Sequence, residues 1–386
     1  MNVVLFDEEE VWQQLLPFTF TKPVSELRLG IFTLREKWAA NLEYPCSSLS
    51  RNYLKEKYPA ELGEDNFFIN SKLVPDPALV EAITELHPDQ ALFKGTTVLA
   101  YRGLLRKPAE INTFKRINYA KEYNSIERVW DLFQKCGMGI ESDLQIISKK
   151  RKSQTLSASV TVIGDRSKVF LEEGAKAEAC ILNTTNGPIY IGKEAEIMEG
   201  SVVRGPFALG EHSVLKLCTK IYGPSSIGPH CKVGGEVNNS VLLGYSNKAH
   251  DGFLGNSVVG EWCNLGADTN NSNLKNNYAN VNLYSYKTQK LENTGLQFCG
   301  LMMGDHSKSG INTMFNTGTV VGVGCNIYGG GFPPTHIPSF SWGGSEGLQE
   351  YKLEKLFETA ERIFERRGLV FDEIEKNILR TVKDGL

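Results

Sequence analysis

The stretch from Ile191 to Val233 constrains the fold more than any other part of this 386-residue chain. An aliphatic residue recurs there at every sixth position, at Ile191, Ile197, Val203, Leu209, Leu215, Ile221, Ile227 and Val233. Neither an α-helix, with a period of about 3.6 residues, nor an amphipathic strand, with a period of about 2, produces this spacing. A three-sided coil of short strands and turns does, because three hexads complete one turn and each repeated side chain points inward. The stretch therefore predicts a β-solenoid with a continuous aliphatic core.

The repeat continues on both sides of this stretch with shifts in phase. Upstream, interior positions are expected at Ile163, Val169, Ala175 and Ile181. Downstream, after Gly234-Gly235, they are expected at Val241, Asn247, Phe253, Val259 and Leu265, and finally at Val321 and Ile327. Extra residues between two hexads predict loops that leave the solenoid at a corner.

Composition narrows the classes of function. A net charge of −3 and a pI near 6.2 argue against a general nucleic-acid binder, which needs a basic face. No window approaches twenty apolar residues, and the acidic start of the chain does not resemble a signal peptide. We therefore expect a cytoplasmic protein that does not enter a membrane.

Cysteine and histidine spacing gives no indication of a metal site. The eight cysteines contain no close pair, and the six histidines contain no pair four residues apart. The sequence predicts free thiols and no structural metal.

The first part of the chain has a different sequence pattern, which predicts alternating strands and helices. Strands are expected at residues 3–6, 66–70, 91–93 and 97–101, and helices at 25–38, 76–86 and 125–136. Alternation of this kind predicts an α/β domain. A basic linker at 149–153 leads into the solenoid, and two helices at 348–367 and 372–383 are expected to cover its open end. The predicted domains are therefore 1–153, 154–345 and 346–386.

Four segments resemble one family. Residues 250–267, HDGFLGNSVVGEWCNLGA, are similar to an acetyltransferase motif H-x-x-Y-x-G-(D/N)-x-x-(V/I)-G-x-x-x-N-x-G-A-G, although Asp268 stands where the motif has its last glycine. Residues 303–312, MGDHSKSGIN, are similar to I-G-D-x-x-x-x-G-I-N. LPFT with KP at 16–23, and LVPD at 73–76, resemble nucleotidyltransferase signatures. The family is that of the sugar-1-phosphate nucleotidyltransferases with a C-terminal β-helix, which includes the bifunctional N-acetylglucosamine-1-phosphate uridyltransferase/glucosamine-1-phosphate acetyltransferase and archaeal relatives. The resemblance implies left-handed winding of the solenoid and a homotrimer with the acetyl-CoA site between subunits.

The same resemblance implies site residues in the solenoid. His250 matches the base that takes a proton from the attacking amine, and Asn264 matches an amide beside the same cleft. Phe253 stands where the family has a substrate-contacting tyrosine, and Asn238 where it has a phosphate-contacting lysine. These two differences predict an acceptor other than glucosamine-1-phosphate. His306 and Lys308 are further candidates for contacts with the CoA thioester or the acceptor. In the alternative interpretation, His250 is a solvent-facing corner residue and Asn264 a turn residue.

The N-terminal domain departs further from the family. Nucleotidyl transfer needs Mg²⁺ and a glycine-rich loop, whereas this chain has Leu5-Phe6-Asp7-Glu8-Glu9-Glu10 at the corresponding place. Lys22, Arg28 and Arg35 are the candidates for contacts with a sugar phosphate.

Three functions remain open at this point. The first is acyl transfer from acetyl-CoA to an amino sugar that carries a phosphate or a nucleotide. The second is sugar-1-phosphate nucleotidyl transfer, with the solenoid serving assembly. The third is a non-catalytic assembly or regulatory role.

Overall fold

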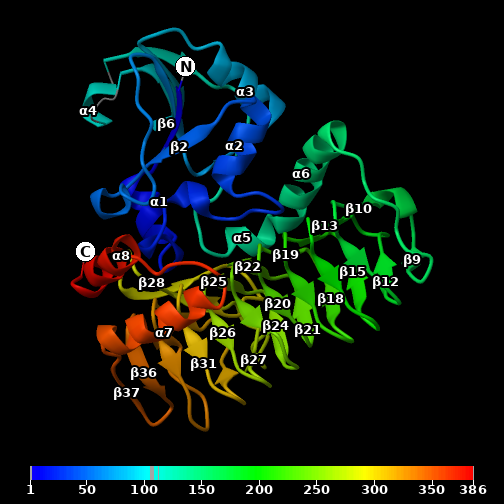
Figure 1. Ribbon diagram of the computed structural model, residues 1–386. Coiled ribbons are helices and arrows are strands. Elements are labelled where there is room, and N and C mark those ends of the chain that lie inside the picture. The colour runs from blue at the N-terminus through cyan, green and yellow to red at the C-terminus, as the bar shows by residue number, and fades with distance from the viewer. Residues whose placement is uncertain (1, 105–107, 112, 386) are drawn as a thin grey trace. The chain divides into compact units, whose positions relative to one another are not determined.

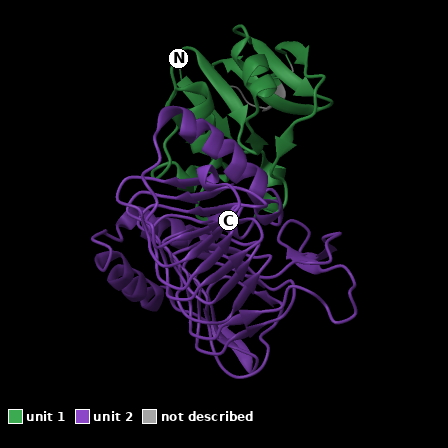
Figure 2. Ribbon diagram, turned by 90° about the vertical axis from the view of Figure 1, so that its right-hand side faces the viewer, with its two compact units in different colours: residues 1–15, 21–27, 32–128 green, residues 16–20, 28–31, 129–386 purple. Residues whose placement is uncertain are grey.

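The computed structural model describes residues 2–104, 108–111 and 113–385 (Figure 1). The chain divides into two compact units (Figure 2): one of residues 1–15, 21–27 and 32–128, and a second of residues 16–20, 28–31 and 129–386. The first unit ends before the predicted boundary at 153, because a helix that precedes the solenoid belongs to the second. The predicted fold class is confirmed: an α/β domain, a parallel β-solenoid and a helical tail follow one another. The handedness of the solenoid stays a prediction.

The first unit is built on a six-stranded mixed sheet. Its strands, in the order in which they neighbour one another, are β2 (Cys46–Leu49), β1 (Asn2–Phe6), β3 (Asn66–Asn70), β6 (Thr97–Gly103), β5 (Gln90–Lys94) and β7 (Lys115–Asn118). β1 pairs in parallel with β2 and β3, so the carboxyl ends of these three strands share one edge of the sheet. All four predicted strands are confirmed. A short antiparallel pair joins β4 (Leu73–Val74), which follows β3 in the chain, to β8 (Asn124–Ser125), which follows β7.

The helices of the first unit are α1 (Glu9–Gln14), α2 (Leu34–Leu42), α3 (Pro77–Thr84) and α4 (Pro108–Ile111). Side-chain caps mark the start of two of them, α2 and α3. Asp76 caps α3 by accepting from the N–H groups of Ala78 and Leu79, which confirms the helix expected there. The helix expected at 25–38 begins only at Leu34, because Thr33 and Glu36 form a capping box at that point.

The solenoid of the second unit has three faces of parallel strands. Face 1 consists of β10 (Val169–Leu171), β13 (Ile189–Ile191), β16 (Phe207–Leu209), β19 (Ser225–Ile227), β22 (Val241–Gly244), β25 (Val258–Glu261), β30 (Met302–Met303), β33 (Val320–Val321) and β35 (His336–Ile337). Face 2 consists of β11 (Lys176–Ala177), β14 (Glu196–Ile197), β17 (Val214–Leu215), β20 (Lys232–Val233), β23 (Asn247–Lys248), β26 (Asn264–Leu265), β31 (Lys308–Ser309), β34 (Asn326–Ile327), β36 (Ser341–Gly344) and the antiparallel β37 (Gly347–Glu350). Face 3 consists of β9 (Thr161–Ile163), β12 (Ile181–Asn183), β15 (Val202–Arg204), β18 (Lys220–Tyr222), β21 (Glu236–Asn238) and β24 (Phe253–Gly255).

Two further strand pairs belong to the same unit. β27 (Asn270–Asn271) pairs in parallel with β32 (Met314–Phe315). Between these two strands in the chain, β28 (Asn282–Ser285) and β29 (Lys290–Asn293) form an antiparallel hairpin.

The six-residue repeat does form the interior of the solenoid. All eight aliphatic residues from Ile191 to Val233 are buried in one continuous core cluster. The phase predicted on either side is partly wrong. Upstream, Ile163 and Ile181 are 47% and 37% exposed, while Leu182 points inward. Downstream, the interior positions are Leu242, Lys248 and Leu254 in place of Val241, Asn247 and Phe253, whereas Val169, Val259, Leu265, Val321 and Ile327 are confirmed. The downstream cause is a pair of shortened steps, from Val233 to Val237 and from Val237 to Leu242, which the six-residue repeat does not reveal.

Helix α6 (Cys136–Lys150) packs over β16 and β19 of face 1, after the single turn α5 (Asp131–Gln134). The helix predicted at 125–136 is therefore misplaced. Two glycines near the start of α6 weaken the helical pattern, but the packing requires one of them. A Cβ on Gly139 would lie 2.5 Å from the carbonyl oxygen of Leu29. Asp143 of α6 accepts a hydrogen bond from the N–H of Ile31 at 2.9 Å, which ties residues 28–31 to the helix.

The tail of the chain lies along a corner of the solenoid and does not cover its open end. β37 closes the last strand edge of face 2. α7 (Leu353–Glu365) then packs Phe364 against Trp262, with ring centroids 3.9 Å apart. α8 (Glu373–Lys383) begins at its cap Asp372, as predicted. The first predicted helix starts later than residue 348, because residues 347–350 pair with β36.

Candidate functional site

Polar residues occupy outward positions on four neighbouring strands of face 2. Asn247, Asn264, Lys308 and Asn326 pair in register along β23, β26, β31 and β34. Asn247 Nδ2 donates to Asn264 Oδ1 at 3.4 Å, and Lys308 Nζ donates to the carbonyl oxygen of His306 at 2.9 Å. Burial lowers the pKa of the Lys308 amine to about 8. The structure therefore brings together two predicted site residues, Asn264 and Lys308.

His250 lies at the corner between face 2 and face 3, and its side chain is exposed. The preceding coil passes this corner at Gly235, where a Cβ would lie 2.9 Å from the His250 carbonyl oxygen. On the following coil, the Asp268 N–H donates to the Asp251 carbonyl oxygen at 3.0 Å. His250 follows Asn247, the residue that pairs with Asn264, by three positions.

Lys248 is a lysine at an interior position of the solenoid. Its register partner on β20 is the core residue Val233, and it is only 2% exposed. Its Nζ donates to the carbonyl oxygen of His250. Burial lowers the pKa of this amine to about 8, against the opposing effect of the carboxylates of Asp251 and Asp268. Lys248 therefore ties the interior of the coil to the corner that carries His250.

Phe253 and Asn238 occupy neighbouring strands of face 3. Phe253 begins β24 and pairs with Glu236, whereas Asn238 ends β21 and pairs with Gly255. β24 separates the His250 corner from the end of face 3 at which Asn238 lies. The structure therefore places Asn238 away from His250.

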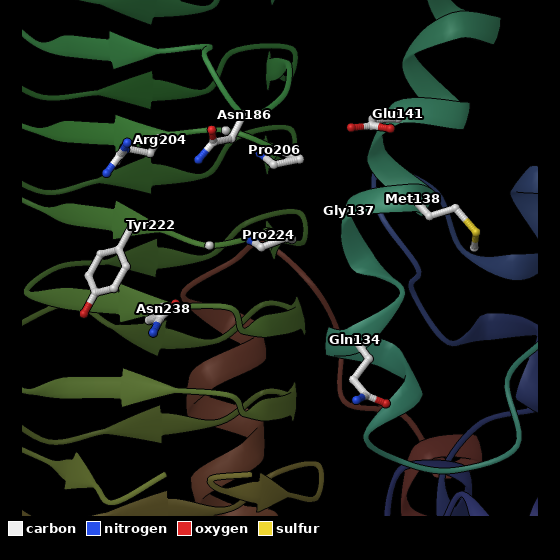
Figure 3. A pocket seen from close by; sticks show the side chains of 12 residues that line it. Gln134, Gly137, Met138, Glu141, Asn186, Arg204, Pro206, Tyr222, Pro224 and Asn238 are labelled. Atoms are coloured by element: carbon white, nitrogen blue, oxygen red, sulfur yellow. The ribbon is translucent and has the colours of Figure 1, made fainter. Parts of the chain in front are cut away.

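Asn238 instead lines a groove of about 590 Å³ between α6 and the solenoid (Figure 3). Arg204, Tyr222 and Asn238 come from successive strands of face 3 and form one wall. Gln134, Met138 and Glu141 come from α5 and α6 and form the other. Asn186, Pro206 and Pro224 lie at the corner between the walls. The Tyr222 hydroxyl donates to Glu236, and burial together with this bond raises the pKa of Tyr222 to about 12.

His306 does not reach a substrate-accessible surface. It is 4% exposed and belongs to a stack of rings that follows the corner between face 1 and face 2. The stack comprises His212, His230, Tyr245, Trp262 and His306, with neighbouring centroids 4.3–6.4 Å apart. Phe364 of α7 lies 6.3 Å from the His306 ring and Phe371 lies 6.2 Å from it. The prediction that His306 contacts the acceptor or CoA is therefore corrected: the side chain packs under the tail.

The three cations predicted to meet a sugar phosphate are engaged elsewhere. Lys22 is buried, with 1% exposure. Arg28 donates through Nε to the carbonyl oxygen of Leu243 at 3.2 Å, and Arg35 forms an ion pair with Glu26. None of the three lines the groove or the cavity of the first unit described next.

That cavity, of about 950 Å³, lies at the carboxyl ends of β1 and β2. Open α/β sheets bind ligands at this edge. Its cationic side chains are Arg51, Lys72 and Arg128, which the sequence analysis missed. The guanidinium of Arg51 stacks 4.1 Å from the centroid of the Trp12 ring. The available signal was that Lys72 lies two residues after a predicted buried strand, at the position where such sheets often place ligand-binding residues.

The acidic residues of this cavity already have partners. The Asp7 carboxylate accepts hydrogen bonds from the hydroxyls of Ser50 and Ser71, and its burial raises its pKa. Lys72 Nζ lies 2.8 Å from a carboxylate oxygen of Glu8. Because these oxygens are engaged, the residues present do not fit a Mg²⁺ site.

Elsewhere in the described ranges, no group of three or more His, Cys, Asp or Glu side chains could hold a metal ion. Across the same ranges, no helix has both the length and the apolar character needed to cross a membrane.

The comparisons with known proteins support the N-terminal resemblance in general form. Residues 3–152 match the family described as sugar nucleotidyl transferase, which supports the predicted class of enzyme, a transferase. The more specific uridyltransferase/acetyltransferase likeness is not shown. No curated protein matches the chain.

Several solved structures are similar at low identity. The polySia-specific acetyltransferase NeuO is 12% identical over 50% of this chain and 87% of its own, with a TM-score of 0.28. The Arabidopsis UDP-N-acetylglucosamine acyltransferase is 14% identical over 57% and 80%, with a TM-score of 0.21. Perosamine N-acetyltransferase from Caulobacter crescentus, in a complex with CoA and GDP-perosamine, is 8% identical over 91% and 96%, with a TM-score of 0.15. At these scores the matches carry no argument about this chain.

Proposed function

We propose that the solenoid transfers an acyl group from a CoA thioester, acetyl-CoA in the first instance, to an amino sugar that carries a phosphate or a nucleotide. The observation that carries the proposal is the exposed imidazole of His250, at a corner where the preceding coil has Gly235 and the next coil has Asn264 on its face 2 strand. Histidine is the side chain most often used as a general base in catalysis.

The chemistry assigns a proton transfer to each step. As the amine nitrogen attacks the thioester carbonyl, His250 takes the amine proton. When the tetrahedral intermediate collapses, the C–S bond breaks and the imidazolium returns the proton to the CoA thiolate. Asn264 supplies an amide beside the base, already oriented by the hydrogen bond from Asn247. No covalent enzyme intermediate is needed.

The first unit is proposed to bind the sugar phosphate or nucleotide part of a substrate. Its 950 Å³ cavity at the carboxyl ends of parallel strands, with Arg51, Lys72 and Arg128 in its lining, supports this role. A homotrimer in the cytoplasm is the proposed state. A monomeric solution mass would contradict the trimer.

Release of free thiol from acetyl-CoA, measured with free, 1-phosphorylated and nucleotide-linked amino sugars, tests the proposal. His250→Ala should lose at least about a hundredfold of the turnover shown by the unaltered chain, the usual contribution of a general base. His212→Ala, which removes another exposed imidazole of the solenoid, is the matched control and should retain turnover. Full turnover in His250→Ala would rule out this base.

A second candidate function, sugar-1-phosphate nucleotidyl transfer, is favoured by the family match of residues 3–152. The pairing of Lys72 with Glu8 and the acidic lining of the cavity oppose it. Pyrophosphate release from nucleoside triphosphates and sugar 1-phosphates, abolished by Lys72→Ala, would establish it. If neither reaction is detected and neither substrate raises the melting temperature, the non-catalytic role is left.

A further inference from the structure

The corner of the solenoid that carries His250 also carries exposed apolar residues on the coils that follow. The register partners of face 2 on β23, β26 and β31 are each followed, three positions later, by a residue of this corner. These corner residues are His250, Ala267 and Ile311. Neighbouring coils lie about 4.8 Å apart, so Ile311 is roughly 10 Å from His250 along the corner.

We define the apolar strip as Ala267, Ile311, Met314 and Tyr328. Ile311 is 71% exposed and Tyr328 is 44% exposed. Tyr328 lies on the next coil beside Gly310, where an added Cβ would be 3.3 Å from the Tyr328 Cβ. Met314 begins β32, three positions after Ile311, and is also exposed. Single exposed apolar residues are ordinary, but neighbouring ones that form one surface mark a place of contact with another molecule.

The backbone along the strip is already hydrogen-bonded within the solenoid. The N–H groups of Gly266 and Gly310 donate to carbonyl oxygens of the following coil, and the Ala267 carbonyl oxygen accepts from the N–H of Asn312. A ligand on the strip therefore gains apolar contact rather than backbone hydrogen bonds. A hydrocarbon chain suits such a surface, whereas the amides of the pantetheine arm of CoA do not.

The position of the strip selects which hydrocarbon it meets. The proposed reaction brings a thioester carbonyl to His250, and the carbon chain of the acyl group begins at that carbonyl. The strip begins on the very next coil, at the small residue Ala267. On the other side of His250 this corner has Gly235 and then one exposed apolar residue, Leu217. The larger apolar surface therefore lies on the Ile311 side.

We propose that the apolar strip binds the acyl chain of the donor, and that the preferred thioester carries a chain of several methylene groups rather than acetyl. The inference rests on the proposed function and deepens it by naming the class of acyl group. The bonds that change at His250 are the same. The amine nitrogen gains the acyl group, the C–S bond breaks, and the amine proton passes through the imidazole to the CoA thiolate.

The test compares acetyl-CoA with octanoyl-CoA by titration calorimetry on the full chain. Octanoyl-CoA should bind at least about tenfold more tightly, because each methylene group removed from water contributes roughly fourfold. Ile311→Ala should reduce this preference about fivefold and leave the affinity for acetyl-CoA unchanged. Leu217→Ala removes another exposed apolar side chain, 62% exposed, from the same corner, and is the matched control that should keep the full preference.

Several results would overturn the inference. They are equal affinities for the two thioesters, an equal loss of both affinities in Ile311→Ala, or a loss of the preference in Leu217→Ala alone. A lower solution mass of Ile311→Ala with an unchanged preference would assign the strip to a second copy of the chain and also overturn it.

His250→Ala separates this inference from the proposed function. That variant should lose thiol release with both thioesters but keep the preference for octanoyl-CoA in binding, because the strip is intact. Thiol release that depends on His250, together with equal affinities for the two thioesters, would refute only the inference. Failure of either thioester to bind the unaltered chain would refute the proposed function itself.

Discussion

Replacing Lys248 with methionine should stabilise the solenoid at neutral pH. The amine lies at a core position with 2% exposure, and its pKa falls from an ordinary 10.5 to about 8. Holding the charge in the folded state at pH 7 therefore costs about 3 kcal/mol. The substitution also removes the hydrogen bond from Nζ to the His250 carbonyl oxygen, and this loss costs about 1 kcal/mol. Methionine fills similar space without a charge, so the net gain should be about 2 kcal/mol.

The gain should depend on pH with a definite sign. The folded pKa of Lys248 lies below its ordinary value, so between about pH 8 and 10.5 the unfolded chain binds a proton that the folded chain has released. The free energy of unfolding of the unaltered chain therefore rises with pH across this window. The advantage of Lys248→Met should shrink accordingly between pH 7 and pH 9.5.

Urea unfolding at the two pH values, followed by circular dichroism, measures both effects. Lys232→Met is the control, because Lys232 sits one residue away from the register partner of Lys248 but points outward. Its unfolding midpoint should match that of the unaltered chain at both pH values. Destabilisation by Lys248→Met at pH 7, with the same difference at pH 9.5, would refute the reasoning.

Two other substitutions probe the packing of the second unit. Phe364→Ala removes the ring that stacks 3.9 Å from Trp262, and should destabilise the attachment of the tail by about 3 kcal/mol. Hydrogen exchange should then become faster in residues 353–383 and stay unchanged in residues 189–233. An intact tail in that variant would show that the stack contributes little. Gly139→Ala places a Cβ 2.5 Å from the Leu29 carbonyl oxygen and should lower the free energy of unfolding by about 2 kcal/mol. Gly330→Ala is the control and should leave stability unchanged, because a Cβ there meets nothing within 4 Å. Equal melting temperatures for the two alanine variants would contradict the close approach of α6.

Much of the fold could be predicted because an interior position in a solenoid demands an aliphatic side chain once per hexad. The run from Ile191 to Val233 obeys that rule without interruption, and its residues are all buried. The phase was lost after Gly235, where the corner shortens and a lysine takes an interior position. A pattern of aliphatic residues does not predict a buried lysine such as Lys248. Its amine finds a hydrogen-bond acceptor, the His250 carbonyl oxygen, only when the corner is folded.

The candidate site was less predictable, because its members meet only in three dimensions. Asn264 and Lys308 are far apart in the chain but become register partners on β26 and β31. The burial of His306 depends on α7, which returns to its corner from the end of the chain. Helix α6 was misplaced because Gly137 and Gly139 argue against a helix by propensity, whereas the close approach to Leu29 explains Gly139. Arg204 and Glu141 likewise line one groove only because α6 packs against the solenoid.

The most direct test of the proposed chemistry is a crystal structure of the full chain with a non-hydrolysable acetyl-CoA analogue bound. The account predicts that the atom replacing the thioester sulfur lies close to the His250 imidazole, with Asn264 lining the same cleft. An analogue bound with its acyl end at any other part of the solenoid, and His250 facing bulk solvent in the complex, would contradict it.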